Sequence, residues 1–537
     1  MTDAPISDAN RPEKDRSEIA LLFAEAQSHH HAGRLSAAQE IYADIVGRDP
    51  HHGDALNLLG AVLAQRGHAD EAVYFLRRAT QTLPKRAPYF CNLGVVLMEL
   101  GRYDESKAAF ERAIAVDRTF ADAYYNLGNL LKQMEVPDAA VLAFAQAHSI
   151  DPTRTDALIN MGNVLYDAGR LDDAVAAFNA AISAAPEASR ATRALINLGN
   201  TYRRMGDAPS AIAAYDYALA RGDADGLRIK RAMTVPVVAQ SNDHIAAIRY
   251  DFEMNVRDLL SADLYVADPF LETSSTNFFL AYHGMDDRRL QELTAQVHLK
   301  SCPDLAFVAP HVGRKPAGKI RIGFVSAFFR RHSVGRLMEG LIAGLPRDAF
   351  EIVVATQPGP RDPIARRIEA SADRLIKLPD GLMPARAALA DAQCDILIYS
   401  DIGMDVRTNF LAFARLASVQ AVMWGHPDTT GIPNIDWFVS SELCEGDGAE
   451  AHYSEKLYRL PTLPTRYARP EIPAALRSRG SFGFDSATHI YLCPQSVIKH
   501  HPDLDCVIVA ILRGDEMGEV VLLEGAVHHW SDQVRAR

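Results

Sequence analysis

Hydrophobic and polar positions in residues 19–222 repeat one amphipathic pattern, in which apolar residues recur at helical spacing between short turns. The segment NLGVVLMELGRYDESKAAFERAIAVD, which starts at Asn92, predicts two antiparallel helices, the first ending at Gly101. Glycine also recurs every 34 residues, at Gly60, Gly94, Gly128 and Gly162. No helix pair of this kind can bury its apolar face alone, so we expect neighbouring pairs to stack into one continuous core.

A 34-residue period of helix pairs, with small residues at fixed offsets, is the signature of the tetratricopeptide (TPR) repeat. We count six units in residues 19–222, after a polar, acidic segment, 1–18, that we expect to be disordered. A second glycine position marks the end of the first helix in each unit. It is occupied by Gly67, Gly101 and Gly169, and by Glu135 in one unit.

One polar position repeats with the helices. Since the first helix of each unit lines the concave face of a TPR superhelix, the amides at this position are expected to form a ladder along the groove. An amide offers both a donor and an acceptor, which suits the backbone of an extended peptide. The alternative is that these side chains only satisfy neighbouring backbone groups between the helices. The residues are Asn92, Asn126, Asn160 and Asn197.

From residue 319 the pattern changes to short apolar runs separated by amphipathic stretches. This alternation predicts a parallel, doubly wound α/β sheet, whose ligand binds at the carboxyl ends of the strands. A second, shorter α/β segment starts near residue 482. Buried strands are predicted at 319–326, 350–356, 374–379, 394–401 and 419–425, and helices at 333–345, 362–372, 383–392 and 409–417.

The predicted strand ends carry the candidate chemistry. His332 follows the first strand and precedes a helix, whose dipole favours the neutral imidazole that a general base requires. A capping or surface histidine is the alternative. The fifth strand ends in Gly425-His426-Pro427, a turn in which His426 is either a site residue or a structural hydrogen bonder.

In the second segment, Gln495 lies at the carboxyl end of a predicted strand, and Lys499 follows one turn later. An anionic ligand there would meet both a helix N-terminus and an ammonium group. A solvated lysine is the alternative.

Composition narrows the class of protein. Residues 1–230 contain 24 basic and 30 acidic residues and the remainder 32 and 38, so neither part is basic and nucleic acid is not an expected partner. The six cysteines show no CxxC pairing, and no apolar run is long enough for a membrane span. The first residues lack the apolar region of a signal peptide. We therefore expect a cytoplasmic protein without a metal site.

Several segments together resemble the protein O-GlcNAc transferase family (glycosyltransferase family 41), which also contains bacterial N-glucosyltransferases. The similar segments are KIRIGFVSAFFRRH at 319–332, VQAVMWGHPDTTG at 419–431, HYSEKLYRLP at 452–461, and Lys499 with Pro502. The resemblance is to a SPINDLY-like bacterial member and extends from about residue 20 to the end of the chain.

The resemblance implies an α-solenoid followed by an α/β glycosyltransferase core of GT-B type. Residues 223–315 would be a helical connector, 316–475 the N-terminal Rossmann-like lobe, and 476–537 the start of the UDP-binding lobe. The family's C-terminal lobe continues well beyond its lysine segment, so we expect a truncated lobe here. Another departure is Phe328-Phe329, where the family has an Asp-Phe pair.

The activity implied is inverting, metal-independent transfer from UDP-GlcNAc or UDP-glucose to an acceptor protein in the TPR groove. His332 and His426 would be the catalytic candidates, Lys499 would neutralise the departing diphosphate, and the asparagine ladder would hold the acceptor. The remaining donor-site candidates are Gly425, Pro427, Thr429, Thr430 and Gln495. The competing interpretation is a non-catalytic TPR scaffold with a vestigial transferase domain. A homo-oligomer is compatible with either.

Overall fold

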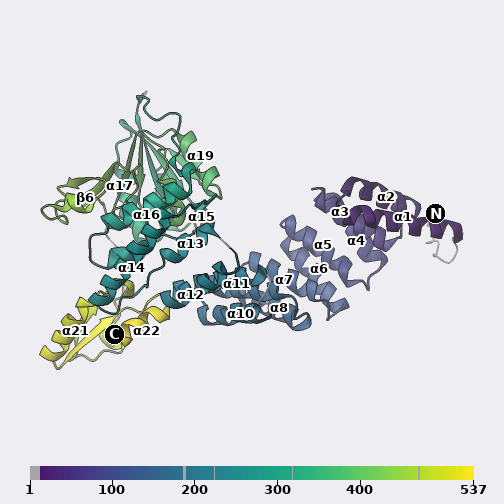
Figure 1. The fold of residues 1–537 in the computed structure, drawn as a ribbon, viewed down its shortest axis with the longest axis horizontal. Helices are drawn as coiled ribbons and strands as arrows, with labels where there is room; N and C mark the ends of the chain where they lie inside the picture. The colour runs from purple at the N-terminus through teal and green to yellow at the C-terminus, as the bar shows by residue number, and fades with distance from the viewer. Residues whose placement is uncertain (1–12, 185–188, 223, 317, 468, 470–471) are drawn as a thin grey trace. The chain divides into compact units, whose positions relative to one another are not determined.

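The computed structural model describes residues 13–537 except 185–188, 223, 317, 468 and 470–471. The chain divides into two compact units, residues 1–201 and 202–537, and the division falls inside the eleventh helix. Each unit is described by itself. Figure 1 shows a helical solenoid in the first and a mixed α/β architecture in the second.

The first unit is built from antiparallel helix pairs, as the period predicts. Its first helix begins at Glu13, so residues 13–18 are helical, while residues 1–12 lie outside the described residues. The helices are α1 (Glu13–His31), α2 (Leu35–Arg48), α3 (Gly53–Gln65), α4 (Ala69–Thr82), α5 (Ala87–Glu99), α6 (Tyr103–Val116), α7 (Ala121–Gln133), α8 (Pro137–Ile150), α9 (Thr155–Asp167), α10 (Leu171–Ala184) and α11 (Ser189–Met205). The next, α12 (Ala208–Leu219), is the first helix that lies wholly in the second unit.

The repeated glycine is required by the packing within each pair. A Cβ atom on Gly94 would lie 2.6 Å from the ring of Phe110, and the same clash arises between Gly128 and Phe144. Ser106 Oγ also donates a 2.6 Å hydrogen bond to the Gly94 carbonyl, which holds α6 against α5. The helices therefore approach closely only because the position has no side chain.

The second glycine position lies in the left-handed region of backbone conformation. Gly67, Gly101 and Gly169 have φ values of 86°, 71° and 77°. Glu135, at the equivalent position of its repeat, adopts φ 58°. The turn geometry is thus kept in this unit although a residue with a Cβ atom occupies it.

In the second unit, the connector packs against the α/β sheet. Its elements are α13 (Asp225–Ala232), α14 (Asn242–Ser261), α15 (Pro269–Glu272), the 3₁₀ helix η2 (Phe278–Tyr282), α16 (Arg288–Ser301) and η3 (Pro303–Ala306). Val256 of α14 and Leu290 of α16 share one buried cluster with Val325 and Tyr399 of the sheet. The connector and the sheet therefore have a common core.

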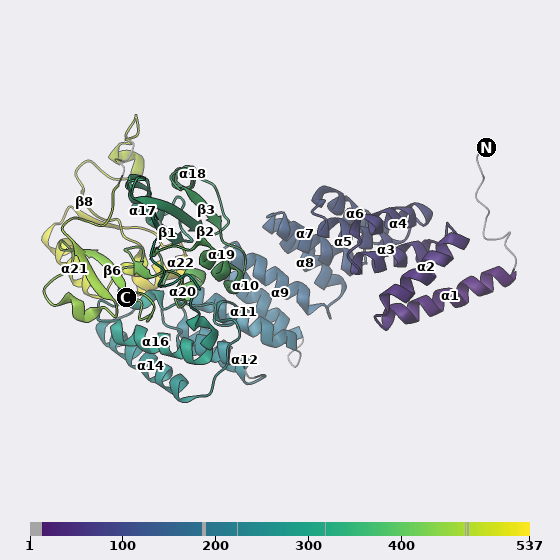
Figure 2. The same ribbon diagram turned by 90° about the horizontal axis from the view of Figure 1, so that it is seen from above.

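The sheet has seven parallel strands in the order β3-β2-β1-β4-β5-β6-β7, which confirms the doubly wound prediction. Helices α17 and α18 cover one face, and α19 and α20 lie on the other with the connector (Figure 2). The strands are β1 (Ile320–Ser326), β2 (Phe350–Thr356), β3 (Arg374–Lys377), β4 (Ile396–Tyr399), β5 (Val419–Val422), β6 (Trp437–Ser441) and β7 (Lys456–Leu460). The helices are α17 (Ser333–Gly344), α18 (Pro363–Ala370), α19 (Leu382–Ala392) and α20 (Val406–Leu411).

Three details of the sheet differ from the sequence prediction. Strand β3 is an edge strand with Leu375 40% exposed, because only β2 pairs with it, and it is not buried as predicted. Helix α20 starts earlier than expected because Asp405 caps it by accepting hydrogen bonds from the backbone of Arg407 and Thr408. Strand β6 was not predicted.

The second α/β segment forms a separate two-stranded parallel sheet, as predicted from the sequence. It consists of η5 (Arg479–Phe482), β8 (His489–Cys493), η6 (Val497–Lys499), α21 (Asp503–Gly514), β9 (Gly518–Leu522) and α22 (His528–Ala536). Trp530 on α22 donates a 3.0 Å hydrogen bond to the Arg204 carbonyl, so α22 is held against the end of α11 within this unit. None of the helices in the described ranges is long and apolar enough to cross a membrane.

Candidate functional site

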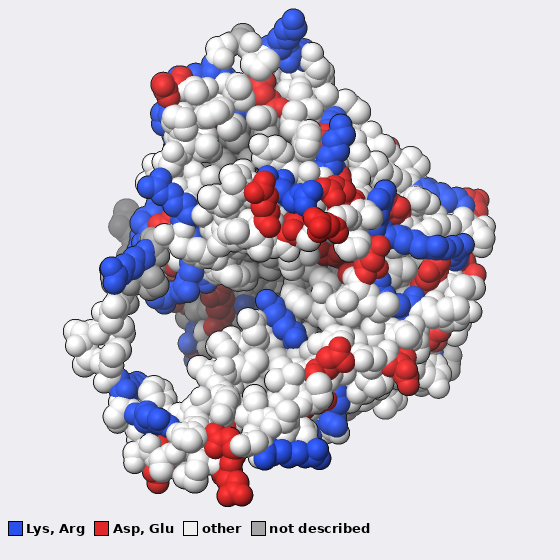
Figure 3. Space-filling model, turned by 90° about the vertical axis from the view of Figure 1, so that its left-hand side faces the viewer, with Lys and Arg blue, Asp and Glu red and all other residues white. Residues whose placement is uncertain are grey.

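A pocket with about 450 Å³ of space, part of it open to solvent, lies at the carboxyl ends of β4 and β5. It is next to the point where the strand order reverses between β1 and β4, the usual ligand position in a doubly wound sheet. Figure 3 shows a hollow on one face of the molecule, between the sheet region and the β8–α21 segment.

The turn after β5 is fixed by close backbone contacts. A Cβ atom on Gly425 would lie 1.3 Å from the Ser400 carbonyl oxygen, so this position accepts no side chain. Gly403, with φ 87°, is close to the His426 ring, since a Cβ there would lie 2.5 Å from Cδ2. The two glycines thus place the His426 ring between the ends of β4 and β5.

His426 is a residue of the pocket whose two ring nitrogens both lack partners in the described part of the chain. It is 3% exposed, and neither of its ring nitrogens has a hydrogen-bond partner among the described residues. The ring stacks on Phe278 of η2, with centroids 5.0 Å apart. Burial, together with the nearby Lys499 ammonium, lowers the pKa of His426 to about 4. The imidazole is therefore neutral at pH 7 and can both donate and accept a hydrogen bond.

Thr429 and Thr430 line the pocket and also hold the turn in place. Thr429 Oγ1 donates a 2.7 Å hydrogen bond to Glu455, and the backbone N–H of Thr430 donates a 2.9 Å bond to the same carboxylate. Gly431 N donates to Ser454 Oγ at 3.1 Å. The predicted donor-site turn is thereby tied to the 452–461 segment.

The opposite wall of the pocket comes from the connector. Asn277 donates to Gln291 Oε1 at 3.2 Å and to Thr294 Oγ1 at 2.9 Å, while Gln291 Nε2 donates to Asp428 at 2.8 Å. Burial, with repulsion from Asp287, raises the pKa of Asp428 to about 8. The sequence reasoning missed this wall. The available signal was a set of polar side chains on otherwise apolar helical faces.

Asp401 links the loop after β1 to the end of β4. Its Oδ2 accepts hydrogen bonds from Ser326 Oγ at 3.1 Å and from the Ala327 backbone N–H at 2.8 Å. Burial, reinforced by Asp405, raises the pKa of Asp401 to about 7. This carboxyl group positions the loop that leads to His332.

His332 is the N-cap of α17. Its Nδ1 accepts a 3.2 Å hydrogen bond from the Val334 backbone N–H, and its ring stacks on Phe328 with centroids 4.4 Å apart. Burial and the charge of Arg330 lower its pKa. Since Nδ1 must be unprotonated to accept this bond, the neutral ring carries its proton on Nε2, and proton acceptance there requires the other tautomer. The capping role that the sequence left open is present.

Lys499 from η6 lies on the side of the pocket formed by η2. Its Nζ is 5.8 Å from the centroid of the Tyr282 ring, and its charge contributes to the lowered pKa of His426. The structure thus brings Lys499 and His426 together from two lobes of one unit. Gln495 is exposed in the loop after β8.

Comparisons with known proteins bear on the repeats and on the fold. Models of the tetratricopeptide repeat match residues 29–90, 121–154 and 154–222, and a TPR repeat model matches residues 96–135. A probable SPINDLY UDP-N-acetylglucosamine–peptide N-acetylglucosaminyltransferase of Solanum lycopersicum is 25% identical over 199 residues, 34% of this chain and 21% of that protein. A UDP-glucose:protein N-β-glucosyltransferase of Actinobacillus pleuropneumoniae is 40% identical over 81 residues, 15% of this chain and 12% of that enzyme.

The structure of a mutant O-GlcNAc transferase from Thermobaculum terrenum shares the fold, with a TM-score of 0.53 and 19% identity. The match covers 75% of this chain and 68% of that one. This chain contains tetratricopeptide repeats, and it is similar in sequence segments and in fold to proteins of the O-GlcNAc transferase type. The regions matched in the tomato and bacterial relatives span about a fifth and an eighth of their respective lengths.

The four asparagines predicted to form a ladder make side-chain hydrogen bonds between neighbouring repeats of the first unit, and their role in peptide binding stays a prediction. Each amide nitrogen donates to a side chain of the preceding repeat, and each carbonyl oxygen keeps its acceptor capacity. The series also includes Asn57, which the sequence reasoning missed because it is shifted by one position. The bonds are Asn92 to Asn57 (3.0 Å), Asn126 to Cys91 Sγ (3.3 Å), Asn160 to Tyr125 (3.1 Å) and Asn129 (3.1 Å), and Asn197 to Asn163 (2.8 Å).

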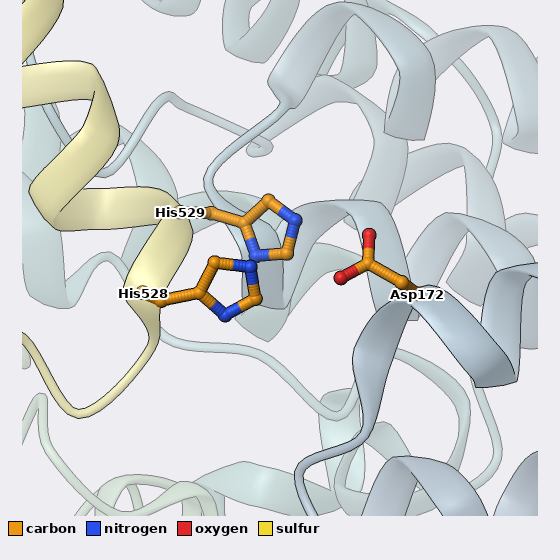
Figure 4. A group of neighbouring side chains, drawn as sticks. All are labelled: Asp172, His528 and His529. Atoms are coloured by element: carbon orange, nitrogen blue, oxygen red, sulfur yellow. The ribbon is translucent and has the colours of Figure 1, made fainter.

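Two neighbouring histidines, His528 and His529, begin α22, with ring centroids 3.9 Å apart (Figure 4). Asp172, which is also labelled there, is a residue of α10. Adjacent histidines by themselves are too few ligands for a zinc site, which takes three or four.

Proposed function

We propose that this chain carries out, or forms the donor-binding part of, a UDP-sugar-dependent transfer to a protein side chain. The observation that supports it most directly is the neutral, buried His426 imidazole, which has no partner among the described residues and lies near the Lys499 ammonium. A buried polar group without a hydrogen bond costs about 1–3 kcal/mol. A bound ligand with hydroxyl and amide groups would satisfy it.

In this proposal, the Lys499 ammonium and the neutral His426 imidazole act on different parts of the donor. Lys499 faces the diphosphate and offsets the charge that develops as UDP leaves. His426 donates a hydrogen bond to the sugar or accepts one from it. His332, held by its capping bond, orients the acceptor from the loop after β1. No metal takes part, and the donor is UDP-GlcNAc or UDP-glucose.

The first test is calorimetric titration of the intact chain with UDP. We expect binding in the micromolar range, weakened about tenfold or more in Lys499→Met, because loss of a charge-assisted contact costs about 1.5–3 kcal/mol. Lys107→Met is the matched control, because this side chain on α6 is 44% exposed, and it leaves the affinity unchanged. Binding that is equal in both variants would contradict the assignment of Lys499.

The second test measures transfer. The chain is incubated with radiolabelled UDP-GlcNAc or UDP-glucose and a peptide library containing serine, threonine and asparagine. Label in peptide that depends on His426 and Lys499 supports the transferase. UDP binding without transfer from either donor would instead favour a binding protein with a vestigial transferase domain.

A further inference from the structure

A second crevice, with about 290 Å³ of space, lies at the carboxyl ends of β1, β2 and β3. Its lining includes Arg330 from the loop after β1, Arg361 from the loop after β2, and Lys377 at the end of β3. Phe329 and Pro358 contribute apolar surface. It is separate from the His426 pocket, because the two share no lining residue.

The charge of the crevice is strongly unbalanced. Three cations line it, and the one acidic lining residue is Glu369. This carboxylate accepts hydrogen bonds from both Arg361, at 2.7 Å, and Lys377. Burial would raise the pKa of Glu369, but these two bonds outweigh it and the net pKa is lowered. Glu369 is therefore ionised and already engaged by two cations.

Arg330 is the cation that remains without an acidic partner among the residues described. Its guanidinium lies over the Phe328 ring, 5.8 Å from the centroid, and is half-buried. The Gly359 backbone is close, since a Cβ there would lie 3.5 Å from Arg330 Nη1. The neighbouring Asp362 already accepts bonds from the Arg331, Ile364 and Ala365 backbone. A half-buried, preorganised guanidinium of this kind suits a carboxylate ligand.

The loop that carries the crevice is fixed before any ligand arrives. Gln357 Nε2 donates a 2.8 Å hydrogen bond to Asp405, the residue that caps α20. Arg361 is 67% exposed at its side chain and uses Nε and Nη2 for Glu369, which leaves Nη1 for a ligand. The protein as a whole has a net charge of −12, so a cationic crevice is a local feature that the overall composition does not produce.

We propose that this crevice binds an acidic side chain of the acceptor polypeptide and so selects acceptors. The inference rests on the proposed function for the identity of the partner. In the strand order, β2 is three positions from β5, which at 4.7–4.9 Å per strand is about 14 Å. An extended peptide advances about 3.3–3.6 Å per residue, so the acidic residue would stand about four positions from the modified one.

The test uses two fluorescein-labelled peptides and fluorescence anisotropy with the intact chain at low salt. Both are rich in glycine and serine, and they differ in having glutamate or glutamine about four residues from a central serine. We expect the glutamate peptide to bind about tenfold more tightly. Arg330→Gln removes most of this difference, whereas Arg330→Lys keeps part of it. Arg374→Gln, at the amino end of the same sheet, is the matched control and has no effect.

Equal affinity for the two peptides overturns the inference, as does an equal loss in Arg330→Gln and Arg374→Gln, which would indicate non-specific attraction. UDP titration of the same variants separates this inference from the proposed function. Loss of the glutamate preference with unchanged UDP binding would mean that the substitution affects the crevice and not the donor site. A glutamate preference that depends on Arg330 in a chain that does not bind UDP would sustain the crevice and reject the transferase.

Discussion

Gly94 permits a direct test of how the repeats pack, because its substitution by alanine has two opposing effects on stability. In Gly94→Ala, the new Cβ would lie 2.6, 2.7 and 2.9 Å from three ring atoms of Phe110, a side chain with no exposed surface. The helices cannot separate freely, because the hydrogen bond from Ser106 to the Gly94 carbonyl joins them. The ring would have to move by several tenths of an ångström.

The magnitude follows from the opposing terms. Overpacking a core costs about 1–3 kcal/mol, and replacing glycine by alanine in a helix gains about 1 kcal/mol. We therefore expect Gly94→Ala to destabilise the solenoid by about 1 kcal/mol, or roughly 2–4 °C for a unit of this size. In a Phe110→Leu background the clash is relieved, so the same substitution becomes neutral or stabilising.

The assay can distinguish the two units. All three tryptophans, Trp424, Trp437 and Trp530, belong to residues 202–537, so tryptophan fluorescence reports on the second unit, while circular dichroism at 222 nm follows the helices of both. We expect the substitution to shift the dichroism transition and leave the fluorescence transition in place. A stabilised Gly94→Ala protein with the wild-type Phe110 would refute the reasoning.

Four further outcomes are expected. Glu135→Gly stabilises the solenoid by about 0.5–1 kcal/mol in thermal melts, because glycine adopts φ 58° without strain. Gly425→Ala abolishes the calorimetric UDP signal, since its Cβ meets the Ser400 carbonyl. Asp428 has a pKa raised from 3.8 to about 8, so the stability it contributes is fully present below pH 3.8 and is lost as the pH rises from there to about 8; Asp428→Asn should flatten the decline in melting temperature over that range. Treatment with EDTA leaves UDP binding unchanged in the proposed metal-independent mechanism, and a loss restored by added Mg²⁺ would contradict it.

The solenoid and the sheet were predictable because their determinants are local. The 34-residue glycine period follows from the contact of each glycine with its own helix pair, and β1 and β2 are nearly continuous apolar runs. Strand β6 escaped prediction because WFVSS is short and ends in two serines, which resemble a turn. The exposure of β3 depends on its position in the sheet, which its own sequence does not specify.

The candidate site was predictable only in part, because some of its contacts depend on packing between distant parts of the chain. Strand ends carry Gly425, His426 and the loop to His332, so their arrangement at one edge follows from the topology. The pocket wall formed by Asn277 and Gln291 comes from helices more than a hundred residues earlier in the chain, and only tertiary packing brings it there. The Glu455 contacts that hold Thr429 have the same long-range origin.

The connector wall has a practical consequence for dividing the protein. A fragment that began at the first strand would look like a complete α/β domain, yet it would expose the sheet face that Val256 and Leu290 cover. It would also leave Asp428 without the amide of Gln291. Fusing this sheet to another repeat domain would therefore require residues from about 225 onward. The smallest part of the chain that can be transferred is larger than the strand pattern indicates.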